Sequence, residues 1–343
     1  MWVKGEYFDD LDAVAATARA TLDRPAQLSP FDRLEWFRRI WACCPPGAAP
    51  LVVRTRTDGA DAWLFLARQG RGRLVALASW YTLAFAPAYS GAPDPPLKRR
   101  LLRAIARRLR VASLGIARIT LSPVPADEAA LLAGAFRRAG WLALSTPATV
   151  NWRLPVGGRV FAEYWADRPG ALRTTVERKQ GRVATRILDR FDADAWAAYE
   201  QVHAASGKPE EGAPAFLRGF AEDEGAAGTL RLGLAEVDGR PVAAQFWTVE
   251  NGTAVIHTLA HVEDAAEHSP GTLLSAALFA HAIDIDGVQT IDFGTGDDSD
   301  KADWMEERQL LYHVDLFNLR RLSAWPGAAR ARLSALVGRR RVD

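Results

Sequence analysis

Lysine and cysteine are scarce in this chain of 343 residues, and its formal net charge is only +2. The near-zero charge excludes a nucleic-acid-binding protein that depends on bulk basicity. Five lysines stand beside 38 arginines, a bias typical of a GC-rich genome, so each lysine is a residue to examine. Hydrophobic residues make up 49% of the chain, enough to bury real cores, and the length favours two domains.

The two cysteines, Cys43 and Cys44, are neighbours in the sequence. Adjacent cysteines seldom form a structural disulfide, and two thiols alone cannot make a zinc site, so we predict ordinary buried or half-buried thiols in a reducing cytoplasm. The first 12 residues are acidic and lack the apolar core of a signal peptide. The longest uncharged run, Leu74–Pro93, is interrupted by polar and turn residues, which predicts buried strands joined by turns instead of a membrane span.

Apolar periodicity and turn residues predict the same α+β order of elements in both halves of the chain. In the first half we expect helices over 11–22, 30–42, 97–111 and 126–139, and strands over 51–55, 62–67, 73–82, 118–121 and 149–154. In the second half we expect helices over 161–178, 193–205, 270–283 and 300–308, and strands over 183–188, 230–237, 242–248, 254–260, 290–293 and 311–317. The dipeptides Asp238-Gly239 and Asn251-Gly252 are typical of two-residue β-hairpin turns. We therefore predict two similar halves, residues 1–154 and 155–319, followed by a basic amphipathic tail over 320–343.

Four strings in the second half, in this order, carry a family resemblance: His203–Glu210, Leu230–Trp247, Ser269–Thr272 and Ile291–Asp298. Together they resemble the GNAT-superfamily acetyltransferase domain of FemAB-like and CelD-like bacterial proteins. The resemblance covers about residues 160–320, and the first half resembles the degenerate, non-catalytic GNAT-like half of such proteins. The family usually has a tryptophan where this chain has Gly207, which leaves the acceptor pocket open to reshaping.

The resemblance implies an α+β fold of two tandem GNAT-like halves, each a mixed, mostly antiparallel sheet flanked by helices. It also implies that the strand at 254–260 splays from the strand at 290–293 and admits the pantetheine arm of an acyl-CoA. Backbone groups around Leu259 and His261 would then pair with the amides of that arm. The implied reaction is an N-acyl transfer from acyl-CoA to an amine, by direct attack in a ternary complex.

Ser269, Gly271 and Thr272 begin a helix, where free N–H groups and the helix dipole favour an anion such as the CoA pyrophosphate. A plain helix cap, with Ser before Pro, explains the same residues. The glycine content of this loop is low for the family, since only Gly271 is present, so a long-chain or carrier-protein donor also fits.

An acidic cluster, namely Asp292, Asp297, Asp298 and Asp300, precedes Lys301. Its spacing does not follow the calcium-loop pattern, and we expect no metal. A solvated, helix-capping turn is one interpretation. In the other, Asp297 takes a proton from the attacking ammonium, while Lys301 orients Asp297 or holds an anionic part of the acceptor.

Histidine and lysine near the end of the helix over 193–205 form a second candidate group. His203 could simply complement the helix dipole, or act as an alternative base. Lys208 and Glu210 are expected to shape the acceptor site, together with Gln245 and Trp304, although Gln245 also suits a core position.

Three further residues have open interpretations. Tyr312 could protonate the leaving thiolate, the role that the resemblance implies, or be an ordinary strand aromatic. His257 and His261 share one face of a strand, and we expect structural polar packing because no third metal ligand is obvious.

The C-terminal tail holds seven arginines and one aspartate among scattered leucine and tryptophan residues. It could lie on an anionic membrane surface, aided by the basic helix over 97–111, or be a solvated terminus. The sequence therefore predicts a cytoplasmic acyl-CoA-dependent N-acyltransferase, peripheral on the inner membrane if the tail binds there. The acceptor would be an amine of a lipid, of the sphingoid type for example, or of the cell envelope. The alternatives are an aminoacyl transferase that uses aminoacyl-tRNA, and a non-catalytic module of envelope polysaccharide assembly.

Overall fold

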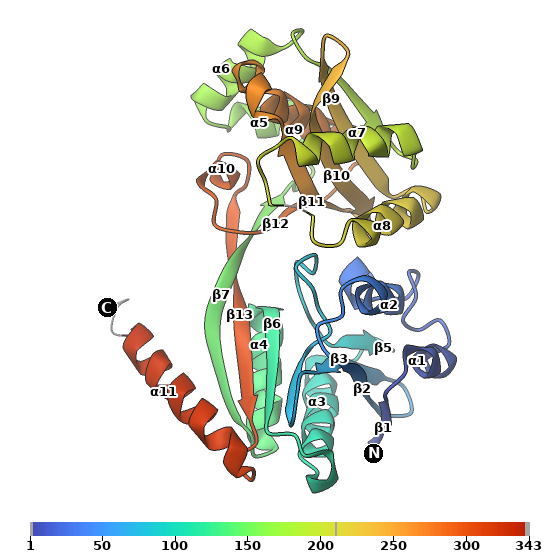
Figure 1. The fold of residues 1–343 in the computed structure, drawn as a ribbon, viewed down its shortest axis with the longest axis vertical. Coiled ribbons are helices and arrows are strands. Elements are labelled where there is room, and N and C mark those ends of the chain that lie inside the picture. The colour runs from blue at the N-terminus through green and yellow to red at the C-terminus, as the bar shows by residue number, and fades with distance from the viewer. Residues whose placement is uncertain (1–2, 210, 340–343) are drawn as a thin grey trace. The chain divides into compact units, whose positions relative to one another are not determined.

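The computed structural model describes residues 3–209 and 211–339 and divides into two compact units. The first unit comprises Met1–Thr149 and Leu310–Asp343, and the second comprises Val150–Gln309. Each unit combines strands with flanking helices (Figure 1). Two long strands, β7 (Leu142–Pro155) and β13 (Glu307–Phe317), carry residues of both units.

The first unit contains a mixed, mostly antiparallel sheet. Its strands β1 to β4 pair antiparallel in chain order, β4 pairs parallel with β6, and β6 pairs antiparallel with β13. A short strand, β5, pairs with β3. These strands are β1 (Lys4–Phe8), β2 (Ala49–Arg56), β3 (Asp61–Arg68), β4 (Arg73–Ala76), β5 (Ala88–Ser90) and β6 (Arg118–Pro125).

The helices of the first unit are α1 (Leu11–Ala18), α2 (Leu34–Cys43), α3 (Pro95–Leu109), α4 (Ala126–Arg138) and α11 (Trp325–Arg339). Helix α3 begins where the Asp94 carboxylate accepts the Leu97 N–H at 2.7 Å and proline fills the first helical position. Its predicted apolar face is confirmed, because its leucines and its isoleucine at 101, 102, 105 and 109 are fully buried.

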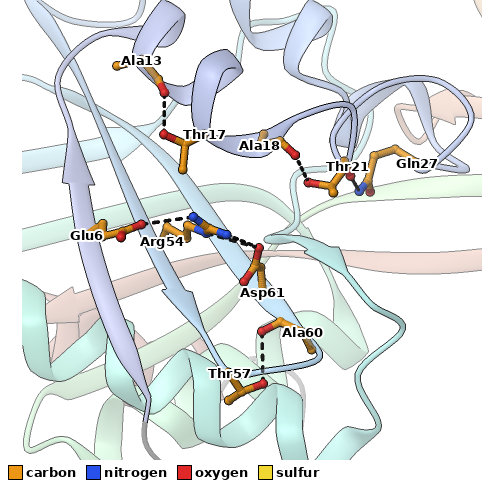
Figure 2. Close-up of polar contacts among 10 residues, drawn as sticks. All are labelled: Glu6, Ala13, Thr17, Ala18, Thr21, Gln27, Arg54, Thr57, Ala60 and Asp61. Carbon is orange, nitrogen blue, oxygen red and sulfur yellow. Dashed lines mark hydrogen bonds and ion pairs between the residues drawn. The ribbon is translucent and has the colours of Figure 1, made fainter.

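The Arg54 guanidinium makes side-chain contacts across the first three strands (Figure 2). Arg54 on β2 donates to the Asp61 carboxylate on β3 at 2.6 and 3.2 Å, and to Glu6 on β1 at 3.2 Å. The Arg54 side chain is only 9% exposed, so these two carboxylates balance a charge that has lost most of its water.

The second unit contains the sheet that carries the candidate site. Its strand order is β8-β9-β10-β11-β12-β7, and all pairs are antiparallel except β11 with β12. The strands are β8 (Ala184–Leu188), β9 (Leu230–Val237), β10 (Arg240–Glu250), β11 (Thr253–His261) and β12 (Thr290–Thr295). Both predicted hairpins are confirmed, and Asp238, Gly239, Asn251 and Gly252 all have the positive φ that such two-residue turns require.

Helices cover both faces of this sheet. They are α5 (Phe161–Ala166), α6 (Gly170–Lys179), α7 (Ala193–Ala204), α8 (Pro214–Ala226), α9 (Pro270–Ala280) and the short α10 (Ser299–Ala302). Successive side chains of a strand point to opposite faces. Accordingly, Phe246 packs on Trp196 of α7 and Phe220 of α8, whereas Trp247 packs on Phe279 of α9.

Some elements differ from the sequence-based predictions. The single helix expected over 161–178 is two helices, α5 and α6, because Pro169 interrupts it. Helix α8 was not predicted. The helix expected over 300–308 is only α10, and the strand expected over 73–82 ends at Ala76.

The last strand and the cysteines also differ from expectation. We expected residues 311–317 in the second half, but β13 pairs with β6 of the first unit. The boundary expected at 154–155 falls inside β7, and the division lies at 149–150. Cys43 is exposed instead of buried, and Cys44 is half-buried, so one of the two thiols is as expected.

Candidate functional site

The centre of the candidate site is the place where two parallel strands part. Strands β11 and β12 pair only at Thr253–Thr290, Ala254–Ile291 and Val255–Asp292. Beyond Val255, β11 continues to His261 with its other edge still paired to β10. The separation of these strands that the family resemblance implied is therefore present, and the edge of β11 beyond Val255 is not paired with β12.

Lys208 reaches one side of this opening. The residue follows α7 in the chain and is exposed as a whole, yet its ammonium Nζ donates to the Leu259 carbonyl of β11. Desolvation at that position lowers the pKa of Lys208, and the carboxylates of Asp298 and Glu211 act in the opposite direction.

Lys301 reaches the other side. Its ammonium donates to the Thr295 carbonyl at the end of β12 at 2.6 Å, and its side chain is only 11% exposed. Burial lowers the pKa of Lys301, and the positive charge of Lys208 lowers it further, whereas Asp298 raises it. The close approach depends on Gly296, which has φ +119° and where a Cβ would lie 3.1 Å from the Lys301 Nζ.

Carboxylates complete the polar opening. Asp298 lies 3.6 Å from Lys301 Nζ, whereas Asp297 forms a two-point ion pair with Arg308 at 2.6 and 3.0 Å. The hydrogen bonds from Arg308 lower the pKa of Asp297, which makes that carboxylate a weaker base. The expectation that Lys301 orients Asp297 is wrong, because the carboxylate partner of Lys301 is Asp298.

Asp292 belongs to the acidic cluster and to one of the four family strings, although the sequence assigned it no role of its own. It occupies the last position of β12 that pairs with β11, and the Gly294 N–H and the Asn151 amide each donate to it at 2.9 Å. Burial raises the pKa of Asp292, and these hydrogen bonds and the nearby Arg153 oppose the rise. The positive charge of Lys301 also acts on Asp292 and opposes the rise in its pKa.

An apolar pocket of about 310 Å³ lies between α7 and α8. Aromatic and aliphatic side chains form most of its wall, and three ionisable groups line it as well: Glu200, His203 and Glu211. The His203 imidazole lies 3.6 Å from the Glu211 carboxylate. The negative charge of Glu211 in the pocket wall also raises the pKa of Lys208.

The pocket is also joined to β11 by a hydrogen bond. Tyr199, which lines the pocket, shares a 2.9 Å hydrogen bond with Thr258, the residue before Leu259. A ligand in the pocket would therefore lie beside the strand whose carbonyl holds Lys208.

A lysine also lies at the start of α9. Lys179, at the end of α6, donates to the Ser269 hydroxyl at 2.7 Å. Ser269 is the N-cap of α9 with proline after it, as the plain-cap interpretation expects, but it has φ +50° and its side chain makes no cap hydrogen bond. The first-turn N–H groups of Gly271 and Thr272 have no intrahelical partner by geometry, and the His261 imidazole is so near that a Cβ on Gly271 would lie 3.3 Å from it.

Sequence reasoning missed Lys179 and Glu211. Lys179 lies 90 residues before its partner Ser269, so no local spacing connects them. Glu211 follows the matched string His203–Glu210 directly, and that position was its only signal. The predicted site residue Glu210 lies outside the described residues.

The next three predicted site residues are described by the contacts or the strand in which the structure places them. Gln245 is 1% exposed, and its amide donates to Ser275 at 2.7 Å and accepts from Trp247 at 2.9 Å, which joins β10 to α9. Trp304 is buried against Phe279, with its carbonyl accepting the Tyr164 hydroxyl. Tyr312 lies on β13 in the first unit. The substrate-binding and catalytic roles of these three residues stay predictions.

His257 packs as expected for a structural residue. It shares a 2.8 Å hydrogen bond with Thr248, and desolvation lowers its pKa to about 3, so it is neutral at physiological pH. Within residues 3–209 and 211–339, no group of three or more His, Cys, Asp or Glu side chains could hold a metal. No helix in the same part of the chain is long and apolar enough to span a bilayer.

Comparison with known families identifies the region that carries this site. Residues 162–302 match the profile of the acetyltransferase (GNAT) domain family. This match includes β11, β12, both lysines, the pocket between α7 and α8, and the start of α9. No curated protein matches the sequence.

Solved structures with little sequence identity share the fold over most of the chain. The C-terminal domain of a putative lysylphosphatidylglycerol synthetase from Agrobacterium fabrum has a TM-score of 0.58 at 14% identity, covering 96% of this chain and 97% of that one. FemX has a TM-score of 0.56 at 10% identity, covering 83% and 96%. A tandem GNAT protein from the clavulanic acid biosynthesis pathway has a TM-score of 0.50 at 13% identity, covering 91% and 98%.

These matches confirm the resemblance and the fold class predicted from the sequence. The chain has a GNAT-superfamily, FemAB-like fold, with a mixed, mostly antiparallel sheet and flanking helices in tandem GNAT order. The family profile over residues 162–302 supports an acyltransferase.

Proposed function

We propose that the GNAT domain at residues 162–302 transfers an acyl group from a CoA thioester to an amine, by direct attack in a ternary complex. The observation that carries the proposal is the position of the two lysines. Lys208 and Lys301 reach the carbonyls at the two sides of the β11–β12 opening, and the pocket between α7 and α8 adjoins Lys208. A donor and an acceptor can therefore meet beside two cationic groups.

The donor would occupy the opening and the start of α9. The edge of β11 around Leu259 and His261 is not paired with β12 and, beside the Lys208 contact to the Leu259 carbonyl, would offer strand hydrogen bonds to the two amides of a pantetheine arm. Lys179 and the first-turn N–H groups of Gly271 and Thr272 offer charge and donors to the pyrophosphate. This arrangement supports the acyl-CoA donor, and the length of the acyl chain is not part of the proposal.

The acceptor would enter the pocket between α7 and α8. Aromatic walls attract a cation and an alkyl chain alike, and the carboxylates of Glu200 and Glu211 complement an ammonium. We therefore propose a primary amine with an apolar portion, such as the amine of a lipid.

The chemistry requires a free amine and a stabilised oxyanion. His203, held near Glu211, would take the proton of the acceptor ammonium, and the amine nitrogen would then attack the thioester carbonyl carbon. The carbonyl oxygen gains negative charge in the tetrahedral state, and the Lys301 ammonium would stabilise that charge. Collapse of this state breaks the carbon–sulfur bond and releases CoA thiolate. The proton that the nitrogen loses as the amide forms converts the thiolate to the thiol, and the proton on His203 returns to solvent.

An aminoacyl-tRNA donor is the second candidate. The start of α9 offers a single glycine, Gly271, among residues 269–272, which gives a phosphate chain less close backbone contact than a glycine-rich loop. The synthetase of lysylphosphatidylglycerol that shares this fold is named for a product that joins an amino acid to a lipid. In this second candidate, the same lysines would act on an ester carbonyl.

Thermal unfolding of the full chain with different donors separates the two candidates. Acetyl-CoA, palmitoyl-CoA and free CoA should each raise the melting temperature, since they bind the folded state alone. A shift with aminoacyl-tRNA and with none of the CoA compounds would replace the proposed donor by the second candidate. The absence of a shift with all of these compounds would overturn both.

A further inference from the structure

Five arginines line one open cleft of the first unit, which has a volume of about 630 Å³. They come from the ends of α3 and α4 and from the segment after β13: Arg107, Arg110, Arg138, Arg320 and Arg321. Val111, Ala139, Gly140 and Asn318 complete the described lining, which includes no aspartate or glutamate. None of these residues belongs to the GNAT domain match.

The helix ends do not account for so much positive charge. Arginine near a helix C-terminus complements the helix dipole, and Arg110 does so by donating to the Ala139 carbonyl at 3.0 Å. Two helix C-termini together supply a charge of about −1, whereas the guanidinium groups of Arg107, Arg110, Arg138 and Arg320 supply about +4. The remaining positive charge in the cleft is large, and an anion would offset it.

The crowding also acts on Arg110. Desolvation lowers the pKa of Arg110, and the charge of Arg320 lowers it further. Gly140, with φ +85°, makes the approach possible, since a Cβ there would lie 2.5 Å from the Arg110 guanidinium. The charges of Arg110 and Arg320 therefore act on each other, and Gly140 leaves the space that the Arg110 guanidinium occupies.

Exposed apolar side chains stand beside the cleft. Along the chain next to Arg320 and Arg321, the exposed fractions are 40% for Leu319, 76% for Leu322 and 55% for Trp325. On the cleft itself, Val111 is 48% exposed. Ala328 of α11, and Ala324 just before the helix, pack on Phe317 and Ala117 of the first unit.

We infer that this cleft binds the phosphate groups of an anionic phospholipid surface. Guanidinium groups pair with phosphate oxygens in two-point geometry, and an adjoining rim of leucine, valine and tryptophan suits the boundary between headgroups and acyl chains. Three of the four exposed apolar residues are aliphatic, which disfavours single-stranded RNA, whose bases need aromatic platforms. This surface belongs to the first unit and is independent of the transfer reaction.

The test is sedimentation of the full chain with vesicles of phosphatidylcholine, with and without about one third phosphatidylglycerol. The cleft variant is Arg107→Gln with Arg320→Gln, which spares the Arg110 contact to Ala139. The control is Arg71→Gln with Arg99→Gln, two exposed arginines of the same unit outside the cleft, which give the same change in net charge.

Each cleft arginine should contribute about fivefold to vesicle affinity, so the cleft variant should bind roughly 25-fold more weakly and the control should lose much less. Leu322→Ser with Trp325→Ser should also weaken binding, with the net charge unchanged. Glycerol phosphate and an RNA oligonucleotide serve as soluble competitors. Equal losses in the two arginine variants, no binding to the anionic vesicles, or binding only to RNA or to glycerol phosphate would each overturn the inference.

Discussion

Lys208 and Lys301 are bound to the carbonyls of two strands that have parted, Leu259 on β11 and Thr295 on β12. The charge of Lys208 lowers the pKa of Lys301, so the two ammonium groups act on the same space. Two cations at one opening repel each other when the opening is empty, and an oxyanion between them relieves that repulsion. In our account this relationship places the reaction at the end of the β11–β12 ladder.

The pH profile of transfer should report the lowered pKa of Lys301. The protonated lysine stabilises the oxyanion, so kcat/KM should fall on the alkaline side at a pH below the usual lysine pKa of about 10.4. Lys301→Arg should keep part of the activity and remove that alkaline fall, because arginine stays charged. An unchanged alkaline fall in Lys301→Arg would assign it to another group.

Lys179 should act on the phosphates of the donor. Its ammonium lies at the start of α9 beside the Ser269 hydroxyl, so Lys179→Met should raise the KM for acetyl-CoA by about tenfold with kcat little changed. The thioester of N-acetylcysteamine has no phosphate and serves as the control, and its KM should be the same in both proteins. An equal effect on both donors would show that Lys179 supports the fold of α9 instead.

Glu211 should attract the acceptor. Because its carboxylate lines the apolar pocket beside His203, Glu211→Gln should raise the KM for a primary alkylamine by about tenfold without changing the KM for the donor. Glu222→Gln is the matched control, since Glu222 lies on the exposed side of α8 and pairs with Arg218. A similar KM in both variants would place the acceptor elsewhere.

Asp32 should make the stability of the first unit depend on pH. Burial, and then repulsion from Glu128, raise the pKa of Asp32 from 3.8 to about 7. Between about pH 4 and pH 7 the folded chain holds a proton that the unfolded chain has released, so this stabilisation is present at low pH and is lost as the pH rises through 7.

The variant Asp32→Asn isolates this effect. It should raise the melting temperature at pH 8, where the burial of the charge costs up to about 4 kcal/mol, and change it much less at pH 5. Calorimetry at both pH values measures the difference. A rise of equal size at the two pH values would contradict a buried, titrating carboxylate.

The Arg54 ion pairs should differ in their contribution to stability. The Asp61 side chain is 13% exposed and that of Glu6 is 41% exposed (Figure 2). Asp61→Asn should destabilise the protein by about 3 kcal/mol, because it leaves a buried guanidinium short of its main partner, and Glu6→Gln by less than about 1 kcal/mol. Urea unfolding checks both values, and a larger loss from Glu6→Gln would reverse the assignment.

Local chemistry made much of the fold predictable from the sequence. The hairpins at Asp238-Gly239 and Asn251-Gly252 and the buried face of α3 are confirmed, because turn residues and apolar spacing act over a few neighbours. The predictions that differ from the structure include contacts between residues far apart in the sequence. Strand β13 pairs with β6, almost 200 residues earlier in the chain, and nothing in its own sequence indicates which strand it joins.

The same limit applies to the candidate site. The family strings pointed to Lys208 and Lys301, and the structure places them on the two parted strands. The partner of each carboxylate depended on the path of the loop after β12, so the sequence paired Lys301 with Asp297 where the structure has Asp298. Lys179 was missed because its contact with Ser269 spans 90 residues.

The most direct test of the central claim is the rate of acyl transfer by Lys301→Met, with acetyl-CoA and a primary alkylamine as substrates. We predict a fall in kcat of about 100-fold or more with a native melting temperature, since one charged stabiliser of the oxyanion is removed. Arg240→Gln, which breaks the exposed Arg240–Asp264 pair in the same unit, is the control and should transfer at the normal rate. Transfer by folded Lys301→Met at the wild-type rate would contradict the account.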